Sequence, residues 1–127
     1  MTKLSNRQLG AVGVAKTAWA LFRNGYSVLY PMEDFSGYDL VAEKDGKFIR
    51  IQVKSSSAME RRRACYRFLV GTGRDSKELY SANKVDYIVC YAIDSDMFWL
   101  FRVKECTAKN KSCAPKTGSS WRILSDL

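Results

Sequence analysis

The sequence predicts one domain of the α/β or α+β class, spanning residues 1–127. Three observations lead to this prediction: an amphipathic helix at the start, several short strand patterns after it, and the size of the chain. With 127 residues, 46% of them hydrophobic, the chain can bury one core but is too short for two. One helix followed by strands, without an internal repeat, is typical of these two fold classes.

The helix is expected over residues 6–24. Ser5 followed by Gln8 fits a capping box, and Gly25 is a typical residue just beyond a helix C-terminus. Apolar residues recur at helical spacing along this segment and cover roughly half of its circumference: Leu9, Val12, Ala15, Trp19 and Phe22, widened by Ala11, Val14, Ala18 and Leu21. Such an arc is wider than one sheet contact needs, so the helix is expected either to be sandwiched or to meet another subunit.

Strand patterns follow the helix along the chain. They cover residues 26–31, 39–43, 48–54, 65–70, 85–93 and 97–103. Asp45-Gly46 separates the second from the third and is one of the strongest short hairpin signals. Residues 71–84 are polar, with a short helix expected near 76–80. The C-terminal segment 104–127 is basic and rich in Lys, Ser and Thr, and it is expected to be partly irregular.

The predicted hairpin turn brings three polar residues together. With a two-residue loop, Lys44 faces Lys47, and continued pairing places Asp39 directly opposite Gln52, with Cβ atoms about 5 Å apart. Lys54 lies two residues further along the same strand and therefore shares that face. The alternate positions of this strand are apolar and belong in a core: Ile49, Ile51 and Val53.

Several features that are missing from the sequence narrow its chemistry. There is no histidine, which excludes Ser-His-Asp and Cys-His nucleophile systems, His-ligated zinc and a histidine base. The four cysteines have no Cys-x-x-Cys spacing. No apolar run reaches the roughly 18 residues of a membrane-spanning helix, and the first residues lack a secretory signal. We therefore expect a reduced cytoplasmic protein without disulfides or zinc.

The polar trio suggests phosphodiester chemistry. The Asp39 carboxylate, the Gln52 amide oxygen and the Val53 backbone carbonyl are ligands suited to Mg²⁺, or to Mn²⁺ in its place. Such a metal would polarise a phosphodiester and lower the pKa of a bound water. Lys54 would orient that water or stabilise charge in the transition state. The alternative is an ordinary half-exposed polar strand face, which many sheets display.

The net charge indicates a polyanionic partner. Lys and Arg number 21 against 13 Asp and Glu, a formal charge of +8, and nucleic acid is the commonest partner of such a domain. The candidate DNA contacts lie after the polar trio: Ser55, Ser56, Arg61, Arg62, Arg63 and Arg67. The alternative for the arginines is a solvated loop. A domain of this size offers little surface for a long DNA site, so a homodimer or higher homo-oligomer is expected.

These residues resemble a known family. Asp39 followed by Gln52-Val53-Lys54 resembles the core of the PD-(D/E)xK nucleases, and the Gln-x-Lys form is similar to the branch with group I intron homing endonucleases and Holliday-junction-resolvase-like enzymes. Neighbouring segments add to the resemblance: Gly10, residues 24–28, Pro31, Tyr38-Asp39-Leu40, residues 50–55, Tyr80 and residues 85–88. It covers residues 5–103. It implies a restriction-endonuclease-like core, with an N-terminal helix on a mixed sheet with a central hairpin, and a Mg²⁺-dependent endonuclease acting on double-stranded or branched DNA.

The chain departs from that family at one position. The family usually carries a Glu on the first helix that completes the metal site, and by spacing this position is Val14 in the present sequence. Glu33 and Asp34, in the loop before Asp39, are candidates to compensate. Three readings stay open: an active DNA endonuclease, a catalytically weak or inactive DNA-binding protein on the same fold, and an interaction module for an acidic partner.

Overall fold

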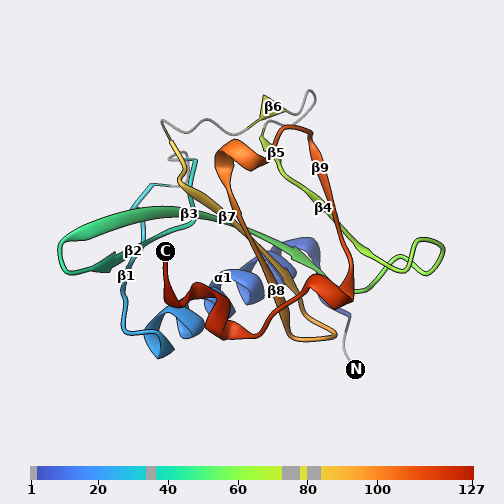
Figure 1. Ribbon diagram of the computed structural model, residues 1–127, viewed down its shortest axis with the longest axis horizontal. Helices are drawn as coiled ribbons and strands as arrows, with labels where there is room; N and C mark the ends of the chain where they lie inside the picture. Colours follow the sequence, from blue (N-terminus) through green and yellow to red (C-terminus); the bar gives the residue numbers. More distant parts are fainter. Residues whose placement is uncertain (1–2, 34–36, 73–77, 80–83) are drawn as a thin grey trace.

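A mixed β-sheet forms the centre of the molecule. The computed structural model describes residues 3–33, 37–72, 78–79 and 84–127. The sheet has five strands in the order β1-β2-β3-β7-β8: β1 (Ser27–Leu29), β2 (Leu40–Lys44), β3 (Lys47–Ser56), β7 (Tyr87–Ala92) and β8 (Met97–Arg102). β3 and β7 run parallel, whereas the other neighbours are antiparallel (Figure 1). The expected α+β architecture, a helix on a mixed sheet, is confirmed.

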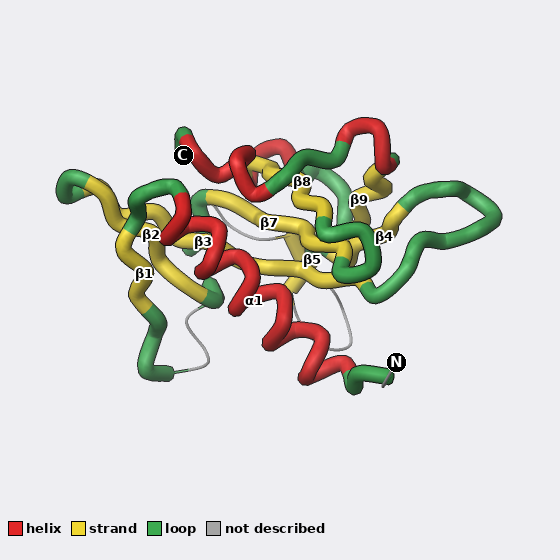
Figure 2. The backbone as a smooth tube through the Cα atoms, turned by 90° about the horizontal axis from the view of Figure 1, so that it is seen from below, coloured by secondary structure: helices red, strands yellow, loops and turns green. Residues whose placement is uncertain are grey.

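Helix α1 (Asn6–Arg23) crosses one face of this sheet (Figure 2). Its capping box is present, because Gln8 N–H donates to Ser5 Oγ at 3.2 Å and Ser5 N–H donates to Gln8 Oε1 at 2.8 Å. The chain leaves the helix through Gly25, whose φ of 85° is in the left-handed region that favours glycine. Among the described residues, no helix is long and apolar enough to cross a membrane.

The sheet is covered on both faces, which gives two apolar cores. The first core lies between α1 and the sheet and takes the alternate residues Ile49, Ile51 and Val53 of β3, as expected. The second lies on the other face, beneath β4 (Tyr66–Leu69) and its antiparallel partner β9 (Asn110–Cys113). Because both faces are covered near the middle of β3, its polar residues Gln52, Lys54 and Ser55 are only partly exposed.

The C-terminal segment is more ordered than its composition indicated. After β8 it forms three short 3₁₀ helices around β9: η1 (Val103–Glu105), η2 (Pro115–Thr117) and η3 (Trp121–Ser125). Leu124 is fully buried in the core beside α1, and Phe98 of β8 exchanges backbone hydrogen bonds of 2.8 and 2.9 Å with Ser119. Trp19 of α1 packs edge-on against Trp121 at 6.1 Å between ring centroids. The wide apolar arc of α1 is thus shared between the sheet and η3.

The region of residues 71–84 differs from the expectation. β5 (Gly71–Thr72) and β6 (Glu78–Leu79) pair as a short antiparallel ladder, so the helix expected near 76–80 is wrong at residues 78–79. The rest of that expected helix, residues 76–77 and 80, lies outside the described residues. A polar composition without a strong apolar period could not distinguish these two structures.

Candidate active site

The hairpin between β2 and β3 has the register that its turn predicts. Asp45 and Gly46 have φ values of 53° and 80°, which is the left-handed backbone of a tight two-residue turn. The pairing then runs from Lys44 opposite Lys47 to Leu40 opposite Ile51. Asp39 directly precedes β2 and therefore lies at the level of Gln52, the next residue along β3.

The site lies where β3 extends beyond the first residue of its partner strand β2. β3 extends to Ser56, so its edge beyond Gln52 has no β2 partner. Asp39 closes the ladder: its N–H donates to the Ile51 carbonyl at 2.9 Å, and its Oδ2 accepts from the Val53 N–H at 2.8 Å. Backbone groups of alternate residues face the same neighbouring strand. The Val53 carbonyl is consequently directed to the same open edge as its N–H.

A pocket of ≈ 530 Å³ lies at this edge. The first half of α1 forms one wall, and the start of β2 with the middle of β3 forms the other. Its lining residues are Gly10, Ala11, Val14, Ala15, Tyr30, Asp39, Gln52 and Val53. The structure therefore brings together Asp39, Gln52 and Val53, and it places Val14 on the helix wall of the same pocket. Sequence reasoning missed Tyr30, which had no motif to mark it.

Electrostatics at Asp39 favour a nearby cation. The pKa of Asp39 is raised from its ordinary value, first because burial disfavours the charged carboxylate. The Val53 N–H and the positive charge of Lys54 oppose this shift. Lys54 is half-buried and does not line the pocket, but it is close enough to act on the carboxylate. Any further cation in the pocket would also favour ionised Asp39.

The donor set fits a weakly held hard cation. The pocket offers one carboxylate, one side-chain amide and one backbone carbonyl, all of them oxygen donors. Over the described ranges, no three His, Cys, Asp or Glu side chains come together as a metal cluster. Mg²⁺ commonly retains several waters and takes only one or two protein carboxylates together with substrate phosphate. The set is therefore sufficient for Mg²⁺ when a phosphate supplies further oxygens.

One of the two acidic residues considered as compensation lies near Asp39. Glu33 is exposed and lines a smaller adjoining hollow of ≈ 230 Å³ together with Tyr30, Tyr38 and Asp39. Asp34 lies outside the described residues. A second carboxylate on the loop side, opposite the apolar helix wall, is thus available.

The basic cluster lies at the tip of a long loop. Arg61, Arg62 and Arg63 are exposed on the turn between β3 and β4, which projects from the body in Figures 1 and 2. Arg63 is 4.0 Å from Glu60, and Arg67 is exposed on β4. Arg61, Arg62 and Arg63 thus share one exposed turn, and none of the four arginines lines the pocket. Their contact with DNA stays a prediction.

The two serines after Lys54 are held within the fold. Ser55 Oγ is buried without a hydrogen-bond partner among the described residues, and it lies so near Gly13 of α1 that a Cβ there would overlap it. Ser56 Oγ donates to the Ala58 carbonyl at 3.1 Å. A phosphate contact by either serine stays a prediction, and it requires the hydroxyl to leave these positions.

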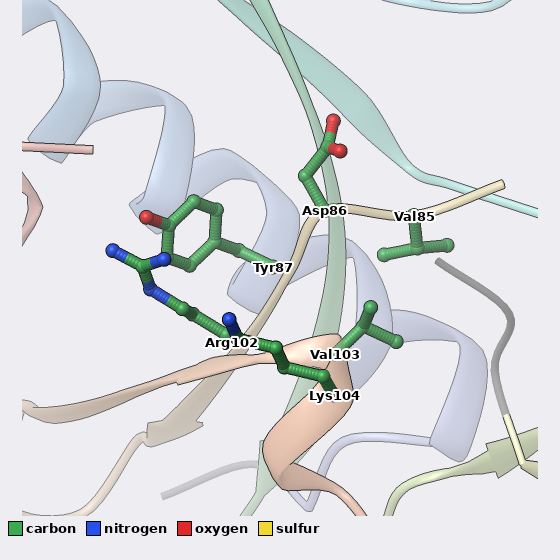
Figure 3. A pocket seen from close by; sticks show the side chains of 6 residues that line it. All are labelled: Val85, Asp86, Tyr87, Arg102, Val103 and Lys104. Carbon is green, nitrogen blue, oxygen red and sulfur yellow. The ribbon is translucent and has the colours of Figure 1, made fainter. Parts of the chain in front are cut away.

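A second hollow of ≈ 230 Å³ lies at the other side of β3, between the start of β7 and the end of β8 (Figure 3). Figure 3 shows the Tyr87 ring beside the Arg102 side chain, while the Asp86 carboxylate points away from them. Asp86 accepts from the Arg50 guanidinium at 3.0 Å and from the Arg50 N–H at 2.9 Å. These bonds lower the pKa of Asp86 and lock β3 to β7. Asp86 therefore has a structural partner rather than a free carboxylate.

The fold and this site together define a class. A helix on a mixed sheet, with Asp before the central hairpin and Gln-x-Lys on its second strand, is the arrangement of a restriction-endonuclease-like domain. The sequence profile of the PD-(D/E)XK endonuclease family matches residues 4–117. The chain belongs to the PD-(D/E)XK endonuclease family.

Individual relatives agree with this assignment. Protein 5.3 of Escherichia phage T7 is 32% identical over 116 residues, which cover 90% of this chain and 94% of that protein. The bacterial homing endonuclease I-Ssp6803I has a similar structure, with a TM-score of 0.76 at 20% identity over 97% of this chain and 93% of its own. Hjc, a Holliday junction resolvase from Archaeoglobus fulgidus, has a TM-score of 0.58 at 15% identity over 91% and 94% of the two chains. These two structures share the fold.

Proposed function

We propose that the chain is a divalent-metal-dependent DNA endonuclease that hydrolyses phosphodiester bonds in the pocket between α1 and β3. The observation that carries this proposal is the convergence of Asp39, Gln52 and Val53 at the unpaired edge of β3. Membership of the family and the nuclease folds of the similar structures support the proposal.

Each site residue has a defined task in this proposal. Asp39, the Gln52 amide oxygen and the Val53 carbonyl would hold Mg²⁺, or Mn²⁺ in its place. When bound there, such a metal would supply Lewis acidity and would lower the pKa of a water molecule. The Val53 N–H fixes the orientation of the Asp39 carboxylate through its 2.8 Å hydrogen bond. Lys54 keeps a positive charge beside the carboxylate and the phosphate, where it stabilises developing negative charge.

DNA is the proposed partner, either double-stranded or branched. The charge of +8 and the exposed arginines on the loop between β3 and β4 support backbone contacts beyond the pocket. Cutting both strands of a duplex requires two sites, so we propose a homodimer or higher homo-oligomer whose symmetry matches that of the DNA. The phage relative supports action in the cytoplasm of a bacterial or phage-infected cell.

A second candidate function rests on Val14. This side chain places an apolar group on the pocket wall, where the resemblance to the family implies a Glu that completes the metal site. A site with one carboxylate can lose metal while the basic surface still binds DNA. The second candidate is therefore a catalytically weak or inactive DNA-binding protein.

Cleavage assays separate the two candidates. Purified chain is incubated with supercoiled plasmid, linear duplex and a four-way junction, in buffer with Mg²⁺, with Mn²⁺ or with EDTA. The endonuclease proposal expects products with a metal only, and it expects Asp39→Asn and Lys54→Ala to abolish them while a gel shift in EDTA stays unchanged. Binding without products under all metal conditions would select the second candidate.

A further inference from the structure

Tyr30 lies at the rim of the proposed active site. It directly follows β1 and lines both the pocket of Gln52 and Val53 and the adjoining hollow of Glu33. Among the described residues, Asp39 is the one other residue that lines both. The Tyr30 ring is thus next to the place where the scissile phosphate would lie.

The Tyr30 ring is largely open to solvent. Tyr30 is 58% exposed and, within the part of the chain that the structure describes, belongs to neither of the two apolar cores. Met32, two residues further, has 102% relative exposure. In Figure 2 the chain after β1 extends away from the sheet. Exposed apolar side chains gathered beside a functional pocket indicate a contact with a ligand or partner.

Charge and position favour DNA as that partner. The surface of the ring is continuous with the pocket proposed to bind a phosphodiester, and the whole chain is strongly basic. In a continuous duplex, bases are stacked inside the helix, and a ring at the level of a backbone phosphate meets no base face. At a branch point or an unpaired nucleotide, the flanking base can leave the stack and lie on an aromatic ring.

We propose that Tyr30 stacks against an unstacked base next to the scissile phosphate, and that the chain therefore prefers branched or locally unpaired DNA to continuous duplex. This inference rests on the proposed endonuclease function, because it takes the pocket of Asp39 as the phosphate site. It goes further by selecting between the double-stranded and branched substrates left open above.

The test measures DNA binding separately from cleavage. Wild type, Tyr30→Ala and Tyr30→Phe are titrated in EDTA with a duplex and with the same duplex carrying one unpaired 2-aminopurine. Phe48→Ala is the matched control, because Phe48 is 61% exposed, lies near the β2–β3 turn and lines neither hollow. Wild type should prefer the unpaired substrate and quench 2-aminopurine fluorescence. Tyr30→Ala should lose about 5- to 150-fold of affinity for that substrate, whereas Tyr30→Phe and the control should retain it.

Three other results would bear on the stacking role of Tyr30. Equal affinity of wild type for the two DNAs, or unchanged preference in Tyr30→Ala, would overturn the inference. A change of subunit number in Tyr30→Ala, measured by sedimentation without DNA, would also overturn it by assigning the ring to a contact between copies. Failure of the endonuclease function is a separate result: Tyr30-dependent preference without cleavage under any metal condition supports the inference and refutes catalysis.

Discussion

Replacing Val14 by Glu tests whether the pocket is a metal site with one missing ligand. Val14 lines the pocket together with Asp39, and that pocket of ≈ 530 Å³ corresponds to a sphere about 10 Å across. Two carboxylates on its wall repel each other by roughly 1–2 kcal/mol at an effective dielectric constant of about 20. Without metal, Val14→Glu should therefore be less stable than Val14→Gln, which has the same shape but no charge.

The stability difference between Val14→Glu and Val14→Gln can be measured as a difference in melting temperature. For a domain of this size, roughly 1–2 kcal/mol corresponds to about 3–10 °C. Because a neighbouring like charge raises a carboxylate pKa, the difference between the two variants should disappear at acid pH, where the carboxylates are protonated. At neutral pH, Mg²⁺ should remove or reverse the difference between the two variants, because the cation binds the folded carboxylate pair and not the unfolded chain.

The assay is thermal unfolding of wild type, Val14→Glu and Val14→Gln at neutral pH, with and without Mg²⁺. A Mg²⁺-dependent rise that is larger in Val14→Glu than in both other proteins is the expected result. Equal melting temperatures of the Glu and Gln variants with Mg²⁺ absent and present would refute the reasoning, because the two side chains would then share no cation site. This readout needs no catalytic activity.

Three other outcomes are expected. Replacing the arginines at 61–63 by alanine should weaken binding to all DNA sequences and flatten the dependence of affinity on salt, measured by gel shift at several salt concentrations. Asp39→Asn should raise the melting temperature at neutral pH in EDTA but not at low pH: burial raises the folded pKa of Asp39, so its destabilising charge appears as pH rises. Leu124→Ala should cost about 2–5 kcal/mol in urea unfolding because Leu124 is fully buried, whereas Leu69→Ala, at a 54% exposed position, should cost under about 1 kcal/mol.

The parts of the fold that could be predicted are those set by local chemistry. Asp45-Gly46 determines the hairpin turn, and the turn determines which residues of β2 and β3 face each other. The position of Asp39 beside Gln52 and Val53 follows from that register. The apolar residues Trp121, Ile123 and Leu124 predict that this end of the chain docks on the body, but no local pattern marks Leu124 as the one that is fully buried. Its burial depends on long-range packing against α1, which no local pattern encodes.

The hydrogen bond between Asp39 and the backbone of β3 could not be predicted from the sequence either. The sequence placed Asp39 across from Gln52 but gave no sign that its carboxylate accepts from the Val53 N–H. That bond exists because β2 begins at Leu40, opposite Ile51, whereas β3 continues to Ser56, so Asp39 meets the backbone of β3 where the ladder ends. Tyr30 was missed for a related reason: its neighbourhood is created by the meeting of α1, β1 and β3, which are distant in the sequence.

The composition of the pocket has an energetic consequence for its ligands. In a pocket with one firm carboxylate, phosphate oxygens of the DNA would complete the ligand set of the metal. Metal and DNA should therefore each raise the affinity of the other by the same factor. A site with several carboxylates would hold the metal alone and would repel phosphate. In this chain the pocket wall has the uncharged Val14 in place of the Glu that the family usually carries there, and the net charge of the chain is +8. Under the proposed function, the molecule would therefore bind DNA first and retain metal only together with the phosphate beside Asp39.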